Sequence, residues 1–190
     1  PVKKNNKKIT ITMISRMSKE KGVLEFVEAS KKFNKIQKNI RFLLVGKFDS
    51  EGPSYVPLKA LQKFNDKKIY PNLDWVGHKE NILEIMQQSS IIVLPSYHEG
   101  VPKVLLEAAA CGKPIIATNI AGCRVIIENN KNGILIKTKS SSSIVKAIKS
   151  ILSKPKKIFN MGKFSRNKAV KEFDVRDVVK KYLATYIKVI

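Results

Sequence analysis

The sequence contains few acidic residues, few arginines and few cysteines. Only 15 residues are acidic against 37 basic ones, and just five of the basic residues are arginine. The two cysteines, Cys111 and Cys123, supply neither a disulfide framework nor the spacing of a metal site. This cysteine usage favours a reducing compartment, and we expect the protein to be cytoplasmic.

Long apolar runs are also missing. No stretch of the sequence approaches the roughly 20 apolar residues that a membrane-spanning helix needs. The first residues, PVKKNNKKITITMI, lack a small-residue cleavage site, and the alternation around Thr10 and Thr12 predicts a strand instead of a signal peptide. Because the chain begins with Pro1 and not with methionine, we expect it to have been cut from a longer protein or processed.

The net charge of +22 has three possible explanations. Lysines spread along the whole chain, together with much asparagine and isoleucine, are typical of a genome-wide compositional bias. A basic surface also attracts the anionic lipids at the inner face of the plasma membrane, or a nucleic acid. We expect no nucleic-acid partner, because arginine, which makes the commonest specific contact with bases, is scarce. A basic nucleic-acid or anionic-membrane module stays as the alternative function.

Short β-branched segments alternate with helical patterns along the chain. Strands are expected at 8–14, 41–46, 73–77, 91–95, 114–118 and 133–136. Helices are expected at 20–36, just after Pro57, at 81–89, at 101–111 and throughout the tail from about 140, with Ser140 or Ser141 as an N-cap and Pro155 in a first turn. Short apolar strands between helices are buried on both faces, which predicts an α/β fold with a parallel sheet and right-handed crossovers.

The first group of candidate site residues follows the predicted strand 91–95. In such sheets, ligands bind outside the carboxyl ends of the strands. Pro102 suits a first helical position, so the free N–H groups of the helix would face a phosphate, and Gly100 would let the backbone come close to it. The carboxylates of Glu99 and Glu107 would accept hydrogen bonds from sugar hydroxyls. Alternatively, Glu99 caps the helix and Glu107 is a solvated surface residue.

Two further groups also follow predicted strands. In SRMSKEKG (15–22), Arg16 and Lys21 would bind a diphosphate; alternatively, Arg16 pairs with a nearby carboxylate and Lys21 is simply solvated. In WVGHKENI (75–82), Gly77 and His78 would meet a nucleobase, although a lone histidine is more often a surface residue. The sequence has no G-x-G-x-x-G after its first strand, no P-loop, no metal cluster and no Ser/His/Asp set.

These motifs together resemble the C-terminal, donor-binding domain of the bacterial family 4 retaining glycosyltransferases, over about residues 8–185. Glu99 and Glu107 match the E-x7-E pattern of the family, and Arg16 and Lys21 match its G-R-L-x-x-x-K-G loop. The segment TNIAGCRVIIENNKNGILI is similar to T-D-x-x-G-C-R-E…N-G-x-L in enzymes that build capsule, O-antigen and lipid-linked glycans.

The resemblance implies the Rossmann-like C-terminal half of a GT-B glycosyltransferase that binds a nucleotide-sugar, most simply a UDP-sugar, without a metal or other cofactor. Glu99 would be the catalytic residue and hold the transferred sugar, and Glu107 would bind the ribose. Gly77 and His78 would lie beside the base. The diphosphate would be bound by these residues: Arg16, Lys21, Gly100, Val101, Pro102, Lys103 and Val104.

The resemblance also implies a division of labour. Residues 1–190 would form one donor-binding domain, with 140–190 as a helical C-terminal extension. The acceptor-binding N-terminal domain would precede residue 1, and it would bind a lipid-linked or polysaccharide acceptor. We therefore expect this chain to bind a nucleotide-sugar weakly and not to turn it over, because half of the cleft that orients the reactants lies elsewhere. A GT-B nucleotide-sugar epimerase is a further alternative.

Overall fold

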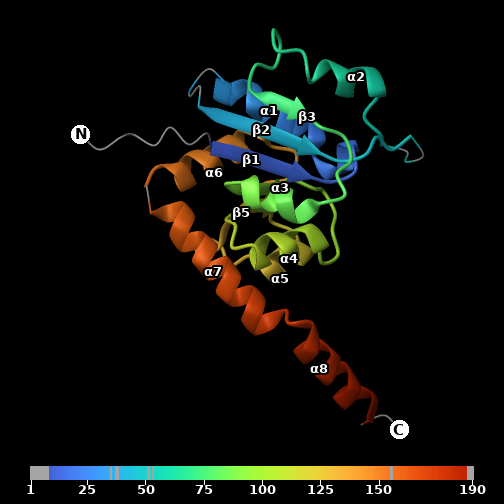
Figure 1. Cartoon of the computed structure of the whole chain (residues 1–190), viewed down its shortest axis with the longest axis vertical. Coiled ribbons are helices and arrows are strands. Elements are labelled where there is room, and N and C mark those ends of the chain that lie inside the picture. Colours follow the sequence, from blue (N-terminus) through green and yellow to red (C-terminus); the bar gives the residue numbers. More distant parts are fainter. Residues whose placement is uncertain are drawn as a thin grey trace.

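The computed structural model describes residues 9–34, 36, 39–50, 52, 54–154 and 156–187. Its centre is a six-stranded sheet with the order β3-β2-β1-β4-β5-β6, in which all paired neighbours are parallel (Figure 1). The strands are β1 (Ile9–Ile14), β2 (Ile40–Val45), β3 (Leu73–Trp75), β4 (Ile91–Leu94), β5 (Ile115–Thr118) and β6 (Gly133–Ile136). The α/β fold with a Rossmann-like parallel sheet is thus confirmed.

Helices connect the strands and cover both faces of the sheet. They are the 3-10 helix η1 (Lys19–Lys21), α1 (Val23–Asn34), α2 (Leu58–Lys63), α3 (Ile82–Gln88), α4 (Lys103–Ala110), α5 (Ala121–Ile126), α6 (Ser141–Leu152), α7 (Lys157–Glu172) and α8 (Val175–Ile187). The order of the strands reverses between β1 and β4, so the loops that follow these two neighbouring strands diverge to opposite faces. Such a switch point is where open α/β sheets bind their ligands.

Several predicted boundaries are wrong. The helix expected at 20–36 is divided at Gly22, whose φ of +78° places it in the left-handed region. A Cβ at Gly22 would lie 2.3 Å from the carbonyl oxygen of Pro95, so a side chain there would prevent the start of α1 from approaching the end of β4. The helix α5 was not expected, since its six residues include a glycine and show no helical periodicity.

Pro102 is the N-cap of α4 and not its first helical residue. Its ψ of 114° is extended, while its carbonyl oxygen already accepts a hydrogen bond from the N–H of Leu105 at 3.0 Å. The predicted cap of α6 is confirmed. Ser140 caps α6 by accepting a hydrogen bond from the N–H of Ser143, and Gly112 follows the C-cap of α4 with a φ of 64°. Pro155 and Lys8 lie outside the described residues.

The core lies on both sides of the sheet. On one side Phe42 of β2 packs between Phe26 and Phe33 of α1, with ring centroids 5.3 and 5.9 Å away, and α6 packs against α1. On the other side Leu105 and Ala108 of α4 are fully buried beneath α7. Burial on both faces explains why the strand sequences are almost uniformly apolar.

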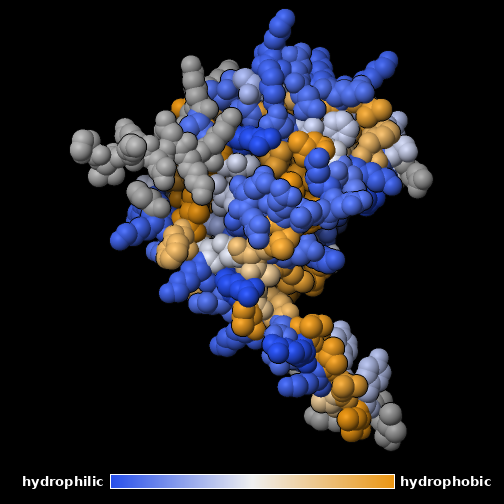
Figure 2. All heavy atoms as spheres, viewed as in Figure 1, coloured by the Kyte–Doolittle hydropathy of each residue, from blue (hydrophilic) through white to orange (hydrophobic). Residues whose placement is uncertain are grey.

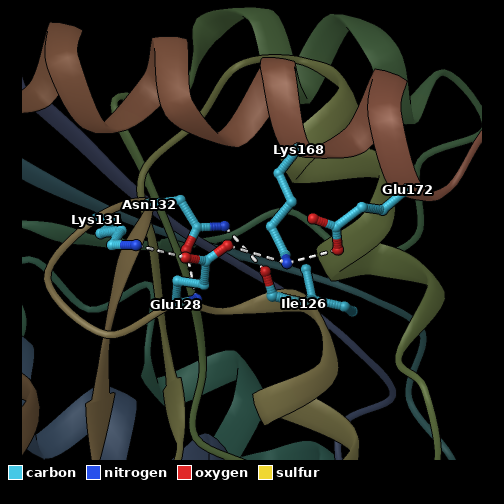
Figure 3. A network of polar contacts seen from close by, with 6 residues as sticks. All are labelled: Ile126, Glu128, Lys131, Asn132, Lys168 and Glu172. Atoms are coloured by element: carbon cyan, nitrogen blue, oxygen red, sulfur yellow. Dashed lines mark hydrogen bonds and ion pairs between the residues drawn. The ribbon is translucent and has the colours of Figure 1, made fainter.

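A polar network ties α7 to the loop between α5 and β6 (Figure 3). The ammonium of Lys168, whose side chain is 9% exposed, contacts Glu128 at 3.1 Å and Glu172 at 2.6 Å. In the same loop Asn132 donates a hydrogen bond to the carbonyl oxygen of Ile126. A network of several charges contributes more to stability than an isolated surface pair.

The last helix, α8, extends beyond the body of the molecule (Figure 1). Large hydrophobic side chains are exposed along it, including Val175, Tyr182, Leu183 and Ile187. In Figure 2 orange, hydrophobic atoms lie along this protruding helix. Within the described residues, none of the helices has the length and apolar character needed to traverse a bilayer.

We expect Phe42→Ala to lower the free energy of unfolding by about 3–5 kcal/mol, because it leaves a cavity between two rings. Phe159→Ala is the matched control, since that side chain is 71% exposed, and it should change stability by less than about 0.5 kcal/mol. Urea denaturation measures both. Equal losses in the two variants would contradict this description of the core.

Candidate functional site

The loops that follow β1, β4 and β5 meet at the carboxyl edge of the sheet. The backbone N–H of Tyr97 donates to the carbonyl oxygen of Glu20 at 2.8 Å, which joins the β4–α4 loop to η1. On the other side of the same loop, the hydroxyl of Thr118, the last residue of β5, donates to the carbonyl oxygen of Ser96. The loop is therefore held between the elements that follow β1 and β5.

An ion pair between Lys21 and Glu99 lies at the centre of this edge. The Nζ of Lys21 is 2.7 Å from Oε1 of Glu99, and the two side chains are only 20% and 13% exposed. Both of the alternative explanations fail for this pair. Lys21 is not simply solvated, and Glu99 is not a helix cap, because α4 has no side-chain cap.

Arg16 lies on the β1 loop and pairs with carboxylates. Its Nη1 is 2.7 Å from Oδ2 of Asp49 in the loop after β2, and its Nη2 is 3.8 Å from Glu20. The alternative that Arg16 binds a nearby carboxylate is thus what the structure shows. Its side chain stays 59% exposed, so the guanidinium remains accessible to a ligand at this edge.

Glu107 lies on α4 and interacts with Lys103, one turn earlier, at 3.6 Å. Both side chains are accessible, at 38% and 88% exposure, and they line a groove between α4 and the α7–α8 junction, with Leu106 and Phe173. Among the described residues, no polar contact joins Glu107 to Arg16, Lys21 or Glu99. The structure therefore links Lys21 to Glu99 directly and places Arg16 beside η1, but it leaves Glu107 apart from them.

The turn before α4 is open to solvent on one side and tightly packed on the other. A Cβ added at Gly100 would have no atom within 4 Å, whereas one added at Gly122 of α5 would lie 1.2 Å from the carbonyl oxygen of Gly100. Val101 is 54% exposed, and the first turn of α4 begins at Lys103 next to it. Helix α5 thus packs against one side of the Gly100 turn, and the other side stays accessible to solvent.

Gly77 and His78 lie beyond β3, two strands away from β1. Gly77 has a φ of 67°, and its carbonyl oxygen accepts a hydrogen bond from the N–H of Gly46 at 2.8 Å. A Cβ at Gly46 would lie 1.7 Å from the carbonyl oxygen of Ser15, so the ends of β1, β2 and β3 are in close contact. His78 is exposed at this edge.

Cys123 lies in α5, the helix that supports the Gly100 turn, but it is not a candidate nucleophile. Burial raises the pKa of its thiol to about 11, although a hydrogen bond with Thr118 opposes that change. The thiol is therefore protonated near neutral pH. It is unreactive in this form, because only the thiolate is a nucleophile. In the part of the chain that the structure describes, no group of three or more His, Cys, Asp and Glu side chains is arranged to hold a metal ion.

Sequence reasoning did not find Glu20, Asp49, Tyr97 or Gly122. Asp49 meets Arg16, and Gly122 meets Gly100, from elements far away in the sequence, so no local spacing indicates these contacts. Glu20 and Tyr97 lie close to predicted site residues, but the hydrogen bond between their backbones joins two distant loops. Glu20 lies in the segment 15–22 and Gly122 in the segment that begins at Thr118, both of which were singled out, but neither residue was assigned a role.

We expect Gly122→Ala to lower the free energy of unfolding by about 2 kcal/mol, because its methyl group would overlap the backbone of Gly100. Gly100→Ala adds the same methyl group three residues before α4, where no atom is near, and it should change stability by less than about 1 kcal/mol. Thermal and urea denaturation compare the two. A Gly122→Ala protein as stable as Gly100→Ala would show that α5 does not support the turn.

Comparisons with known proteins agree with the geometry. The family model described as "Glycosyl transferases group 1" matches residues 1–168. The N,N'-diacetylbacillosaminyl-diphospho-undecaprenol alpha-1,3-N-acetylgalactosaminyltransferase of Campylobacter jejuni is 34% identical over 185 residues, which are 97% of this chain and 46% of that protein. The UDP-Gal:alpha-D-GlcNAc-diphosphoundecaprenol alpha-1,3-galactosyltransferase of Escherichia coli is 32% identical over 182 residues, covering 94% and 45%.

The solved structure of Anabaena HepE in complex with UDP has the same fold. It superposes with a TM-score of 0.85 at 21% identity, over 96% of this chain and 49% of that one. The chain thus spans about half the length of the curated relatives and of the GT-B structure that it matches. From the family match and the Rossmann-like sheet together, the chain belongs to the glycosyl transferases group 1 family.

Proposed function

We propose that this chain is the donor-binding part of a retaining glycosyltransferase that uses a UDP-sugar to build a cell-surface polysaccharide or lipid-linked glycan. The observation that carries the proposal is the shielded Lys21–Glu99 pair at the switch point of the sheet. It holds a cation suited to a diphosphate beside a carboxylate suited to sugar hydroxyls, where α/β sheets bind ligands.

The relatives support the choice of donor and acceptor. The names of both curated relatives specify a sugar acceptor joined by a diphosphate to undecaprenol, and the E. coli name specifies UDP-Gal as donor. The Anabaena protein was solved with UDP and also with UDP-glucose. A UDP-sugar donor and a lipid-linked acceptor, as in lipopolysaccharide or capsule synthesis, are therefore the substrates that we propose.

Lys21 and Glu99 can both bind the donor while the ion pair between them stays intact. A lysine ammonium has three donors, so Lys21 can keep its contact with Glu99 and also bind a phosphate oxygen. Only Oε1 of Glu99 is bound to Lys21, which leaves Oε2 to accept a hydrogen bond from the transferred sugar. As the bond to the sugar breaks, negative charge grows on UDP, and a fixed cation stabilises that charge.

The other predicted residues would complete the donor site. The exposed guanidinium of Arg16 would exchange part of its contact with Asp49 for the diphosphate, and the N–H groups of Lys103 and Val104 would assist from the start of α4. The pair between Glu107 and Lys103 is accessible to solvent and contributes little, so Glu107 is available to the ribose. We place the base beside Gly77 and His78.

We propose that the acceptor is bound by protein outside these residues. The curated relatives are about twice as long as the matched region, and transfer requires an acceptor held against the donor. This chain alone would then bind donor without transferring its sugar. A cytoplasmic location, at the inner face of the plasma membrane, stays a prediction.

We expect Arg16→Ala, Lys21→Ala and Glu107→Ala each to weaken UDP binding about tenfold, because each removes a charged partner of UDP. Isothermal titration calorimetry of the purified chain with UDP measures the effect. Lys149→Ala, which removes an exposed lysine of α6, is the control and should bind UDP normally. Unchanged binding in all three site variants would contradict the site assignment.

A salt series separates this function from a basic nucleic-acid or membrane-surface module. Binding to a phosphate backbone weakens steeply between about 50 and 200 mM salt, because condensed counterions are released. Binding of UDP should change far less over that range. Tight duplex DNA binding with no detectable UDP binding would favour the alternative.

A further inference from the structure

Tyr97 lies in the middle of the loop that carries Glu99, and three elements converge on it. Its hydroxyl donates a hydrogen bond to Oε1 of Glu25, the third residue of α1, at 2.7 Å. The ammonium of Lys139, from the loop after β6, lies 5.1 Å from the centroid of its ring, within the range of a cation–π contact. Its backbone N–H is bound to Glu20, so ring, hydroxyl and backbone are all fixed.

Glutamate would be an unusual residue at position 25 if its side chain only packed against its neighbours. Its Oε1 accepts the tyrosine hydroxyl, but its Oε2 is buried and has no partner among the described residues. A buried carboxylate oxygen without a hydrogen bond destabilises the folded state, and an apolar side chain would avoid that penalty. The carboxylate is thus better explained by its one contact, the hydroxyl of Tyr97.

The backbone around Lys139 gives a second sign of constraint. Its φ of 53° lies in the left-handed region, which few residues other than glycine adopt. This conformation accompanies the placement of the ammonium over the ring of Tyr97. Burial and the hydrogen bond to Glu25 raise the pKa of Tyr97 to about 12, so its hydroxyl remains a donor at neutral pH.

On the basis of the proposed function, we propose that Tyr97, anchored by Glu25, is a positioning residue that directs Glu99 toward the transferred sugar. Two peptide bonds separate Tyr97 from Glu99, so rotation of the tyrosine would displace the carboxylate. Tyr97 itself would not touch the donor. Because the side chains of Arg16 and Lys21 lie on another loop, binding of the diphosphate would depend less on Tyr97 than binding of the sugar.

The test separates affinity for UDP from affinity for a UDP-sugar. Calorimetry with UDP, UDP-galactose and UDP-N-acetylgalactosamine is carried out on the unmodified protein and on Tyr97→Phe. We expect Tyr97→Phe to weaken the better bound UDP-sugar about fivefold and UDP less than about twofold, because the loss of one charge-assisted hydrogen bond loosens only Glu99.

Two substitutions of Glu25 test the same positioning role independently of Tyr97→Phe. Glu25→Gln keeps an oxygen that accepts the tyrosine hydroxyl and should bind both ligands normally, whereas Glu25→Leu should behave like Tyr97→Phe. Tyr70→Phe is the control for loss of a buried tyrosine hydroxyl, since Tyr70 is 8% exposed and packs on Phe64 away from this edge. It should alter neither affinity.

The outcomes distinguish the inference from the proposed function. Normal UDP-sugar binding in both Tyr97→Phe and Glu25→Leu, or equal losses for UDP and UDP-sugar, would overturn the positioning role while leaving the donor site intact. If Tyr97→Phe does not fold, the contrast between Glu25→Gln and Glu25→Leu decides the matter. Failure of the unmodified protein to bind any of these nucleotides would overturn the proposed function, and the inference with it.

Discussion

The ion pair between Lys21 and Glu99 joins the two loops that leave the sheet at its switch point. The residues are 78 positions apart, and their atoms meet at 2.7 Å in a place that is largely shielded from solvent. Removing either partner would leave a partly buried charge uncompensated, which is costly. The position of Glu99, and with it the sugar-binding side of the proposed site, depends on this contact.

Close backbone packing makes that contact possible. Gly22 lets the start of α1 approach Pro95, and Gly122 lets α5 approach Gly100, so the loop after β4 is confined between two helices. A parallel sheet whose central strands are largely buried supplies the base on which these loops lie. The front of the Gly100 turn stays open, which leaves room for a ligand where the charges are fixed.

The sequence was sufficient to predict the strands and most of the helices but not their mutual contacts. Short apolar segments identified each of the six strands in the described part of the chain, because burial makes that pattern distinctive. Helix α5 was missed since six residues with an internal glycine carry no periodicity, and Pro102 was placed one position too far into α4. The motifs indicated Lys21 and Glu99 separately. Their direct contact, and the support from Tyr97 and Gly122, arises from tertiary packing that no local pattern encodes.

A crystal structure of the protein with UDP bound tests the central claim most directly. We predict diphosphate oxygens within hydrogen-bonding distance of the Nζ of Lys21, with Arg16 and the first turn of α4 on either side and Glu99 still beside Lys21. UDP bound instead in the groove at the opposite edge of the sheet, lined by Lys113, Phe159 and Arg166, would contradict it.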